Sequence, residues 1–190
     1  ALTGTEKTAA ASAAPPVNSC GNTVMAGSGK AVVETTAGKV SGCIRNGIFT
    51  YKGIPYAAPV EGAARFMPPA KPKPWTGVRS SMQYGQVSPQ DARTGWANDE
   101  TAWLFSWDDG IPGEDCLRVN VWTPGINDNK KRPVMVWLHG GGFSAGSGQE
   151  LPSYDGENLS RRGDVVVVSL NHRLGVLGYL NLAEAGGASY

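Results

Sequence analysis

The sequence predicts an α/β fold in which an antiparallel hairpin leads into a covered, mostly parallel central sheet. Asn46-Gly47 lies between residues 40–44 and 48–51, where apolar and polar residues alternate. Asn and Gly both tolerate positive φ, so this pair indicates a tight hairpin turn. Residues 134–138 and 165–168 are short continuous apolar runs. Such runs are typical of strands buried on both faces of a sheet.

The chain divides into two compositional parts. Residues 1–28 are dominated by Ala, Ser, Thr, Gly and Pro, so we expect a mobile N-terminal segment followed by an ordered part over residues 29–190. The first residue is Ala1 rather than Met. This start fits a chain whose leader has been removed, and equally a trimmed sequence. We expect a secreted or periplasmic protein.

The remaining elements follow in chain order. Residues 53–90 are rich in proline, which removes backbone donors, so this stretch is predicted to be irregular. Residues 91–115 are also expected to be irregular, and their aromatic density argues against disorder. Residues 117–122 alternate as in a strand with two different faces. Short helical turns are predicted over residues 158–162 and 174–182.

Charge and composition exclude several function classes. Seventeen basic and sixteen acidic residues give a net charge of +1, which provides no electrostatic attraction to nucleic acid or to an anionic membrane. No apolar run approaches the ~18–20 residues of a membrane-spanning helix. There are three cysteines, two histidines and no CxxC motif, so a metal site has little support. We expect no metal, no cofactor, no nucleic-acid partner and no membrane partner.

The most informative segment is His139-Gly140-Gly141-Gly142, which directly follows the apolar run 134–138. Consecutive glycines present backbone N–H groups with no β-carbon to block an approaching ligand. Such groups can bind an anion, or an oxygen that becomes anionic in a transition state. HGGG after a buried strand is the oxyanion-hole motif of lipases and esterases. A plain glycine-rich turn is the alternative.

With this motif, the chain resembles the N-terminal portion of the type-B carboxylesterase family, which includes cholinesterases and bacterial para-nitrobenzyl esterases. The resemblance covers about residues 38–190. Its motifs occur in the family's order: Gly53-Ile54-Pro55-Tyr56-Ala57 with Arg65-Phe66 and Pro68-Pro69, then EDCLRVNVW at residues 114–122, PVMVWLHGGGFSAG at 133–146 and VSLNHRLGVLG at 168–178.

The resemblance implies an α/β-hydrolase fold and hydrolysis of a small-molecule ester by a serine nucleophile. Residues 29–190 then form the N-terminal part of a catalytic domain. The family's nucleophile, acid and catalytic histidine lie further along than the last of these motifs. We therefore expect a C-terminal segment, or a companion chain of a cleaved protein, to complete the domain. In the family, the second and third glycines donate their N–H groups, which assigns Gly141 and Gly142 to the oxyanion hole.

The resemblance also implies roles for residues outside the glycine motif. Trp103 and Trp107 lie in a stretch that lines the active-site gorge in relatives, and Phe143 directly follows the glycines. These three residues are the candidates for substrate contact, ahead of Trp96. Arg65 and Glu114 match positions that form a structural ion pair, and Arg173 matches another structural arginine.

The cysteines depart from the family pattern. Cys116 is commonly bridged to an upstream cysteine, but the matching position here is Ser88. The resemblance therefore implies a buried free thiol at Cys116. A bridge between Cys20 and Cys43 is an alternative pairing for the other two.

Two other functions compete with this interpretation. Residues 142–146 form a literal G-x-S-x-G around Ser144, and Asp164 and His172 follow in triad order, which would make the chain a hydrolase by itself. However, no strand-to-helix turn is predicted at Ser144, and His172 stands where the family has a structural tyrosine. The second alternative is a non-catalytic cholinesterase-like binding or adhesion module.

Overall fold

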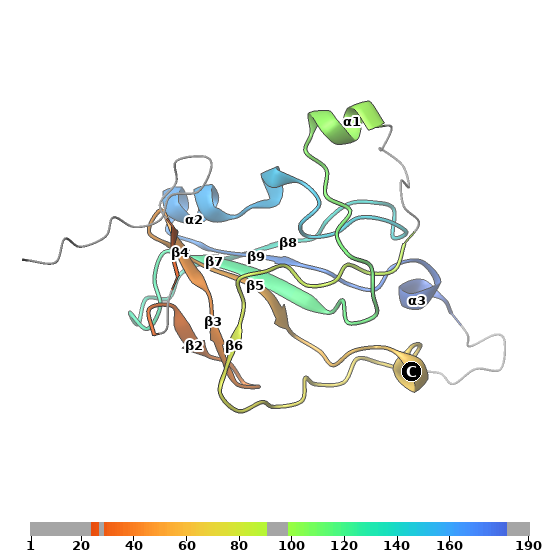
Figure 1. Cartoon of the computed structure of the whole chain (residues 1–190), viewed down its shortest axis with the longest axis horizontal. Coiled ribbons are helices and arrows are strands. Elements are labelled where there is room, and N and C mark those ends of the chain that lie inside the picture. Colours follow the sequence, from red (N-terminus) through yellow and green to blue (C-terminus); the bar gives the residue numbers. More distant parts are fainter. Residues whose placement is uncertain (1–23, 27–28, 91–98, 182–190) are drawn as a thin grey trace, which may run out of the picture.

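The computed structural model describes residues 24–26, 29–90 and 99–181, and it arranges them around two sheets (Figure 1). The larger sheet has six strands in the order β1-β4-β5-β7-β9-β8, and the smaller has the order β2-β3-β6. The strands are β1 Val24–Met25, β2 Val32–Glu34, β3 Lys39–Ser41, β4 Cys43–Arg45, β5 Ile48–Pro55, β6 Val78–Ser80, β7 Arg118–Thr123, β8 Val134–Trp137 and β9 Val166–Leu170.

The larger sheet is mixed. Its neighbouring strands pair antiparallel from β1 through β9, and β8 joins β9 in parallel, with Trp137 opposite Ser169. In the larger sheet, the predicted parallel pairing is thus present, among the described strands, between β8 and β9. Most of the predicted mobile segment 1–28 lies outside the described residues. Near its end, Val24 and Met25 form β1 against β4, and the mobility of the segment stays a prediction.

The predicted hairpin is confirmed. β4 and β5 pair antiparallel with Arg45 opposite Ile48, so Asn46 and Gly47 form the two-residue connection. Their φ angles are 50° and 80°. Positive φ at both central residues is the geometry that matches the twist of the flanking strands.

One face of the larger sheet is covered by α2, Glu157–Gly163, which lies beside β5, β7 and β9 in Figure 1. The buried cluster beneath it comprises Ile48, Trp122 and Val167. A second buried cluster lies around Cys116 and Leu117 and includes Ala57 and Val60. This cluster packs the start of the proline-rich stretch, at Ala57 and Val60, against the two residues that directly precede β7.

The prediction that residues 134–138 are buried on both faces is wrong for this chain. β8 is the edge strand, and Val134, Val136 and Leu138 are 59%, 56% and 66% exposed. The apolar residues of β8 would suit a covered strand, but in the described structure they stay largely exposed, although the Tyr154 ring packs against Trp137 at 5.0 Å. β9, one position further in, has alternate residues Val167 and Ser169 buried.

The remaining elements are short. α1, Asp99–Leu104, lies within the stretch that was expected to be irregular, which corrects that expectation, and it projects from the sheets in Figure 1. α2 contains the predicted helical turn 158–162 and extends it by one residue at each end, and α3, Gly175–Tyr179, falls within the predicted turn 174–182. The two single-turn 3-10 helices are η1, Gly62–Ala64, and η2, Pro152–Tyr154. No helix in the described part of the chain is long and apolar enough to span a membrane.

Candidate functional site

The glycine motif lies at the carboxyl ends of β8 and β9, along the edge of the sheet that these strand ends form. Because these strands are parallel, the segments that follow them meet at the same edge. The motif leaves β8 after Trp137, and residues 171–174 leave β9 toward α3. We call residues 139–146 the glycine loop. Ligand sites in open α/β sheets commonly form beyond such carboxyl ends.

The glycine loop turns back on itself at Gly141. Gly141 and Gly142 have φ angles of 114° and 60°. A β-carbon on Gly141 would lie 1.9 Å from the carbonyl oxygen of Ala145, whereas a β-carbon on Gly142 would meet nothing within 4 Å. The N–H groups of both glycines form no hydrogen bond within the described residues. Both glycines thus carry an unpaired donor, and Gly142 also has open space where a side chain would begin.

Several bonds hold the turn. The amides of Ser144 and Ala145 both donate to the carbonyl of Gly141, each at 3.1 Å. At the end of the loop, Gln90 uses both ends of its side-chain amide. It accepts from Gly146 N at 2.7 Å and donates to Gly146 O at 3.0 Å. Gln90 is 56 residues away in sequence, and nothing in the sequence pattern indicated this role.

The loop is also attached to α3. Gly175 N donates to the carbonyl oxygen of Phe143 at 2.7 Å, and the Phe143 ring lies 4.8 Å from that of Tyr179, centroid to centroid. Tyr179 in turn meets His172 edge-on at 6.2 Å. Since Gly175 and Tyr179 open and close α3, this short helix supports the loop at both of its ends.

His139 and His172 stack face to face. Their ring centroids are 4.6 Å apart and the ring planes differ by 6°. The Nδ1 atom of His139 donates to the carbonyl of Gly140 at 2.8 Å, and its Nε2 atom is buried with no partner in the described structure. Burial lowers the pKa of His139, the carbonyl bond opposes this, and the neighbouring His172 lowers it again.

A buried polar layer continues behind the glycine loop. Asn171, 2% exposed, accepts from Gly148 N at 2.8 Å and donates to Gln86 O at 3.1 Å. Glu150, 5% exposed, accepts from Ser147 N and from the hydroxyl of Tyr154. Burial raises the pKa of Glu150, and these two bonds partly offset the rise. The layer gives the loop a hydrogen-bonded base.

The aromatic candidates fall in two places. Phe143 lies in the glycine loop and is 67% exposed, directly beside the free amides. Trp103 lies on the projecting helix α1 and is 82% exposed. Trp107 is half-buried and donates from Nε1 to Asp109 at 2.8 Å. Trp96 lies outside the described residues. The structure thus brings Phe143 to the site, and Trp103 is left accessible above the sheet.

The described residues do not assemble a triad around Ser144. Its hydroxyl donates to the carbonyl of Gly141 at 3.2 Å, within the loop's own turn. Asp164 lies at the amino end of β9, where it pairs with Arg132 at 2.8 Å, whereas His172 follows the carboxyl end of that strand. A five-residue strand separates the two groups by roughly 15 Å, at about 3.3 Å per residue. Serine, acid and histidine therefore do not meet.

The expected ion pair of Arg65 and Glu114 is present as a two-pronged contact. Arg65 Nη2 lies 2.8 Å from one carboxylate oxygen of Glu114, and Nε contacts the other. The hydrogen bond from Arg65 lowers the pKa of Glu114. Arg173 adds to the same region by donating to the carbonyl oxygens of Arg65 and Met67 at 3.1 and 2.9 Å.

Ser88 stands beside Cys116, as the motif match implied. Both residues are buried, and the Ser88 hydroxyl accepts from Leu174 N at 3.0 Å. Burial raises the pKa of the Cys116 thiol, and a hydrogen bond from Ser88 opposes part of the rise. Cys43 and Cys116 are both free thiols in the described part, and the alternative bridge from Cys43 to Cys20 lies outside it.

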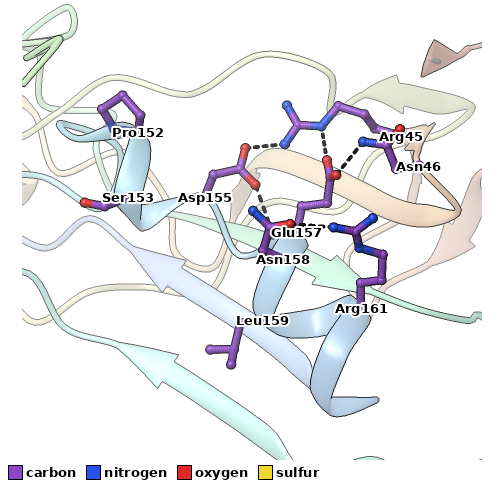
Figure 2. Close-up of a pocket in the computed structure, with 9 residues that line it drawn as sticks. All are labelled: Arg45, Asn46, Pro152, Ser153, Asp155, Glu157, Asn158, Leu159 and Arg161. Atoms are coloured by element: carbon purple, nitrogen blue, oxygen red, sulfur yellow. Dashed lines mark hydrogen bonds and ion pairs between the residues drawn. The ribbon is translucent and has the colours of Figure 1, made fainter. Parts of the chain in front are cut away.

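A separate cavity of about 620 Å³ lies between the β4–β5 turn and α2 (Figure 2). Its charged groups point toward one another. Arg45 contacts the carboxylates of Asp155 and Glu157, and Asn46 donates to Glu157 at 2.7 Å. Because these charges satisfy each other, the cavity is best explained as the polar contact between the hairpin and α2. The described residues contain no cluster of His, Cys, Asp and Glu suited to a metal ion.

The chain is similar to a family of known proteins and to several of its members. The model of the carboxylesterase family matches residues 29–188. The chain is 42% identical over 149 residues to a phenmedipham hydrolase of Pseudarthrobacter oxydans, and 43% identical over 153 residues to a para-nitrobenzyl esterase of Bacillus subtilis. These alignments cover 78% and 80% of this chain but 29% of each relative.

Solved structures agree. An esterase from Clostridium hathewayi that hydrolyses aliphatic aromatic polyesters aligns with a TM-score of 0.76 at 42% identity, covering 87% of this chain and 31% of that one. A Geobacillus stearothermophilus carboxylesterase aligns with a TM-score of 0.70 at 41% identity, covering 83% and 29%. This chain therefore spans less than a third of the length of these relatives.

Proposed function

This chain belongs to the carboxylesterase family, and we propose that it supplies the oxyanion-binding part of a serine ester hydrolase. The predicted α/β-hydrolase fold is confirmed by the structural relatives, with the described part forming a mixed sheet. The observation that carries the proposal is the pair of unpaired amides at Gly141 and Gly142, held in a braced loop at the carboxyl ends of two parallel strands.

The mechanism follows from what these amides can do. A serine from the remainder of the protein attacks the ester carbonyl, and a histidine from the same remainder takes the serine proton and passes it to the leaving alcohol. The carbonyl oxygen becomes negative as the tetrahedral intermediate forms. Gly141 N–H and Gly142 N–H donate to that oxygen, and one such donor contributes about 3 kcal/mol to transition-state stabilisation. Water then releases the acyl group by the same steps.

The remainder of the protein, as a C-terminal segment or a companion chain, is proposed to pair with β8. This strand has an unpaired edge in the described structure and a row of exposed apolar residues that includes Val134, Val136 and Leu138. Exposed apolar strand edges favour aggregation, so a partner strand and covering helices would protect them. The relatives are more than three times as long as the segment they share with this chain, which provides enough sequence for such a partner.

The proposed substrate is a neutral ester with an aromatic or bulky group. Phe143 stands beside the free amides and presents an exposed ring, and Trp103 and Trp107 are proposed to contribute further wall. Two of the relatives are described as acting on esters with aromatic groups: the para-nitrobenzyl esterase and the esterase that hydrolyses aliphatic aromatic polyesters. A secreted or periplasmic location remains a prediction.

The test uses the complete protein that contains this chain. We expect it to hydrolyse para-nitrobenzyl acetate and to be labelled stoichiometrically by a fluorophosphonate, with labelling and loss of turnover proceeding at one rate. A folded protein that is neither labelled nor active would instead support the non-catalytic binding module. Activity from residues 1–190 alone would contradict the proposal that the nucleophile lies elsewhere.

A further inference from the structure

We infer that His172 is a positioning residue for the oxyanion donors, acting on the glycine loop through the stacked ring of His139. The inference rests on the proposed function and deepens it, because it identifies a group that never touches the substrate yet sets the place of Gly141 and Gly142. The sequence marks His172 as unusual, since the family motif has tyrosine at this position.

The sheet brings the two rings together. β8 ends at Trp137 and β9 ends at Leu170, so His139 and His172 each lie two residues beyond the end of their strand. Trp137 pairs with Ser169 in the parallel ladder, which aligns the two exits. The rings meet face to face at 4.6 Å, just beyond the ends of two paired strands.

Each ring is also held by its own backbone. The Nδ1 atom of His139 donates to Gly140 O at 2.8 Å, and the Nδ1 atom of His172 donates to Arg173 O at 2.9 Å. The first of these carbonyls belongs to the peptide whose N–H is that of Gly141. Rotation of the His139 ring would therefore rotate this peptide plane, and with it the direction of a proposed donor.

The His172 ring makes a second contact, with Tyr179. Its ring meets Tyr179 edge-on, Tyr179 contacts Phe143, and the Phe143 carbonyl accepts from Gly175. His172 thus contacts the glycine loop directly at its start, through His139, and indirectly at Phe143, through Tyr179. Removing its ring leaves His139 without a neighbour on one face and Tyr179 without its edge contact.

The contribution should be specific to the transition state. Donors that are slightly misdirected still permit substrate binding but stabilise the developing oxyanion less, so kcat falls while KM is retained. A misplacement of about 1 Å can cost up to a hundredfold in rate. A residue needed only for folding would lower the amount of active enzyme, and with it the apparent kcat at unchanged KM. It would change neither kcat per labelled site nor the affinity for a transition-state analogue.

The experiment compares variants of the complete protein in hydrolysis of para-nitrobenzyl acetate. We expect His172→Ala to lower kcat per labelled site by about tenfold, with KM within about twofold of the wild type. His172→Tyr, which restores a flat ring, should recover most of kcat. His172→Leu fills the space without a flat ring, so it should behave like the alanine variant and is the variant to use where alanine prevents folding.

Two controls separate positioning from stability. The affinity for a trifluoromethyl ketone should fall in parallel with kcat/KM in His172→Ala. Trp75→Ala removes a ring beside the smaller sheet, where Trp75 donates to Lys39 O, and its kcat per labelled site should stay unchanged. Unaltered kcat in both His172→Ala and His172→Leu, or no recovery in His172→Tyr, would overturn the inference. A wild type without hydrolysis or phosphonate labelling would instead overturn the proposed function, and the inference with it.

Discussion

Gly141 approaches the carbonyl oxygen of Ala145 so closely that a β-carbon on residue 141 would lie 1.9 Å from that oxygen. In the same turn, a β-carbon on Gly142 would meet nothing within 4 Å. The two positions therefore differ in whether they can accommodate a side chain, and the activity of substituted variants measures this difference. The close contact means that a side chain at residue 141 would force the turn to move.

Alanine substitutions in the glycine loop should have graded effects. Gly140→Ala meets nothing within 4 Å and has no positive φ, so it should retain activity. Gly142→Ala is open but must adopt a φ of 60°, which costs roughly 1 kcal/mol and should lower kcat by a few-fold. Gly141→Ala combines a φ of 114° with the backbone clash, and kcat should fall a hundredfold or more. Steady-state kinetics of the complete protein gives all three values.

Equal losses in the three variants would contradict this order. They would mean that the remainder of the protein, rather than the loop's own turn, sets the tolerance at each position.

The Arg65–Glu114 pair should make stability depend on acid pH. The hydrogen bond from Arg65 lowers the pKa of Glu114 in the folded state, so its stabilising contribution is fully present above the ordinary carboxyl pKa of 4.5. The contribution is lost as pH falls through the lowered value. We expect Arg65→Met to reduce thermal stability at pH 7 and to weaken its fall on acidification. Melting temperatures between pH 3 and pH 7 test this.

Arg79→Met provides the matched control for that experiment. Arg79 lies over the Trp75 ring at 4.8 Å and forms no ion pair with a carboxylate in the described structure. The Arg79→Met substitution removes one positive charge, as Arg65→Met does. A similar change in the pH profile would therefore show that net charge, not the Arg65–Glu114 pair, is responsible.

Ser88→Cys should create a disulfide with Cys116. Both side chains are buried, and Ser88 is close enough to lower the pKa of the Cys116 thiol. Closing this loop is expected to stabilise the complete protein by about 3–4 kcal/mol under oxidising conditions. Urea unfolding with and without reductant measures the gain. The double variant Ser88→Cys, Cys116→Ala should show no gain, and a persistent free thiol in Ser88→Cys would show that the side chains do not face each other.

Phe143→Ala should weaken the binding of aromatic esters. The exposed ring stands beside the free amides and packs on Tyr179 at 4.8 Å. Losing its contact with an aromatic leaving group should raise KM for para-nitrobenzyl acetate by up to about tenfold, which corresponds to about 1.4 kcal/mol. KM for ethyl acetate, which has no ring, should change little. Parallel changes for both esters would remove Phe143 from the substrate-contact set.

Local signals in the sequence predicted much of the architecture. Asn46-Gly47 specified its turn because both residues accept positive φ, and the alternating pattern located β7. The exposure of β8 was not predictable in the same way. The apolar residues of β8 indicate that this strand needs a covering element, but the sequence does not indicate which segment supplies it, and Val134, Val136 and Leu138 stay exposed in the described structure. α1 has only six residues and lies in an irregular stretch, so its helical periodicity was too short to detect.

The site was predictable where a motif carried it. The free amides of Gly141 and Gly142 and the pairing of Arg65 with Glu114 lie where the motif match indicated. The contact of Gln90 with Gly146 joins residues 56 positions apart with no shared pattern, so no local signal existed. The stacking of His139 and His172 was not predictable by counting. The apolar runs predicted as strands end at residues 138 and 168, one and four residues before the two histidines, whereas the strands of the structure end at Trp137 and Leu170.

The most direct test of the central claim is a crystal structure of the complete protein inhibited by a phosphonate, whose tetrahedral phosphorus places an oxygen where the oxyanion forms. The account predicts that oxygen within 2.7–3.1 Å of both Gly141 N and Gly142 N, with phosphorus bonded to a serine outside this chain. An oxygen that accepts from other donors, or phosphorus bonded to Ser144, would contradict it.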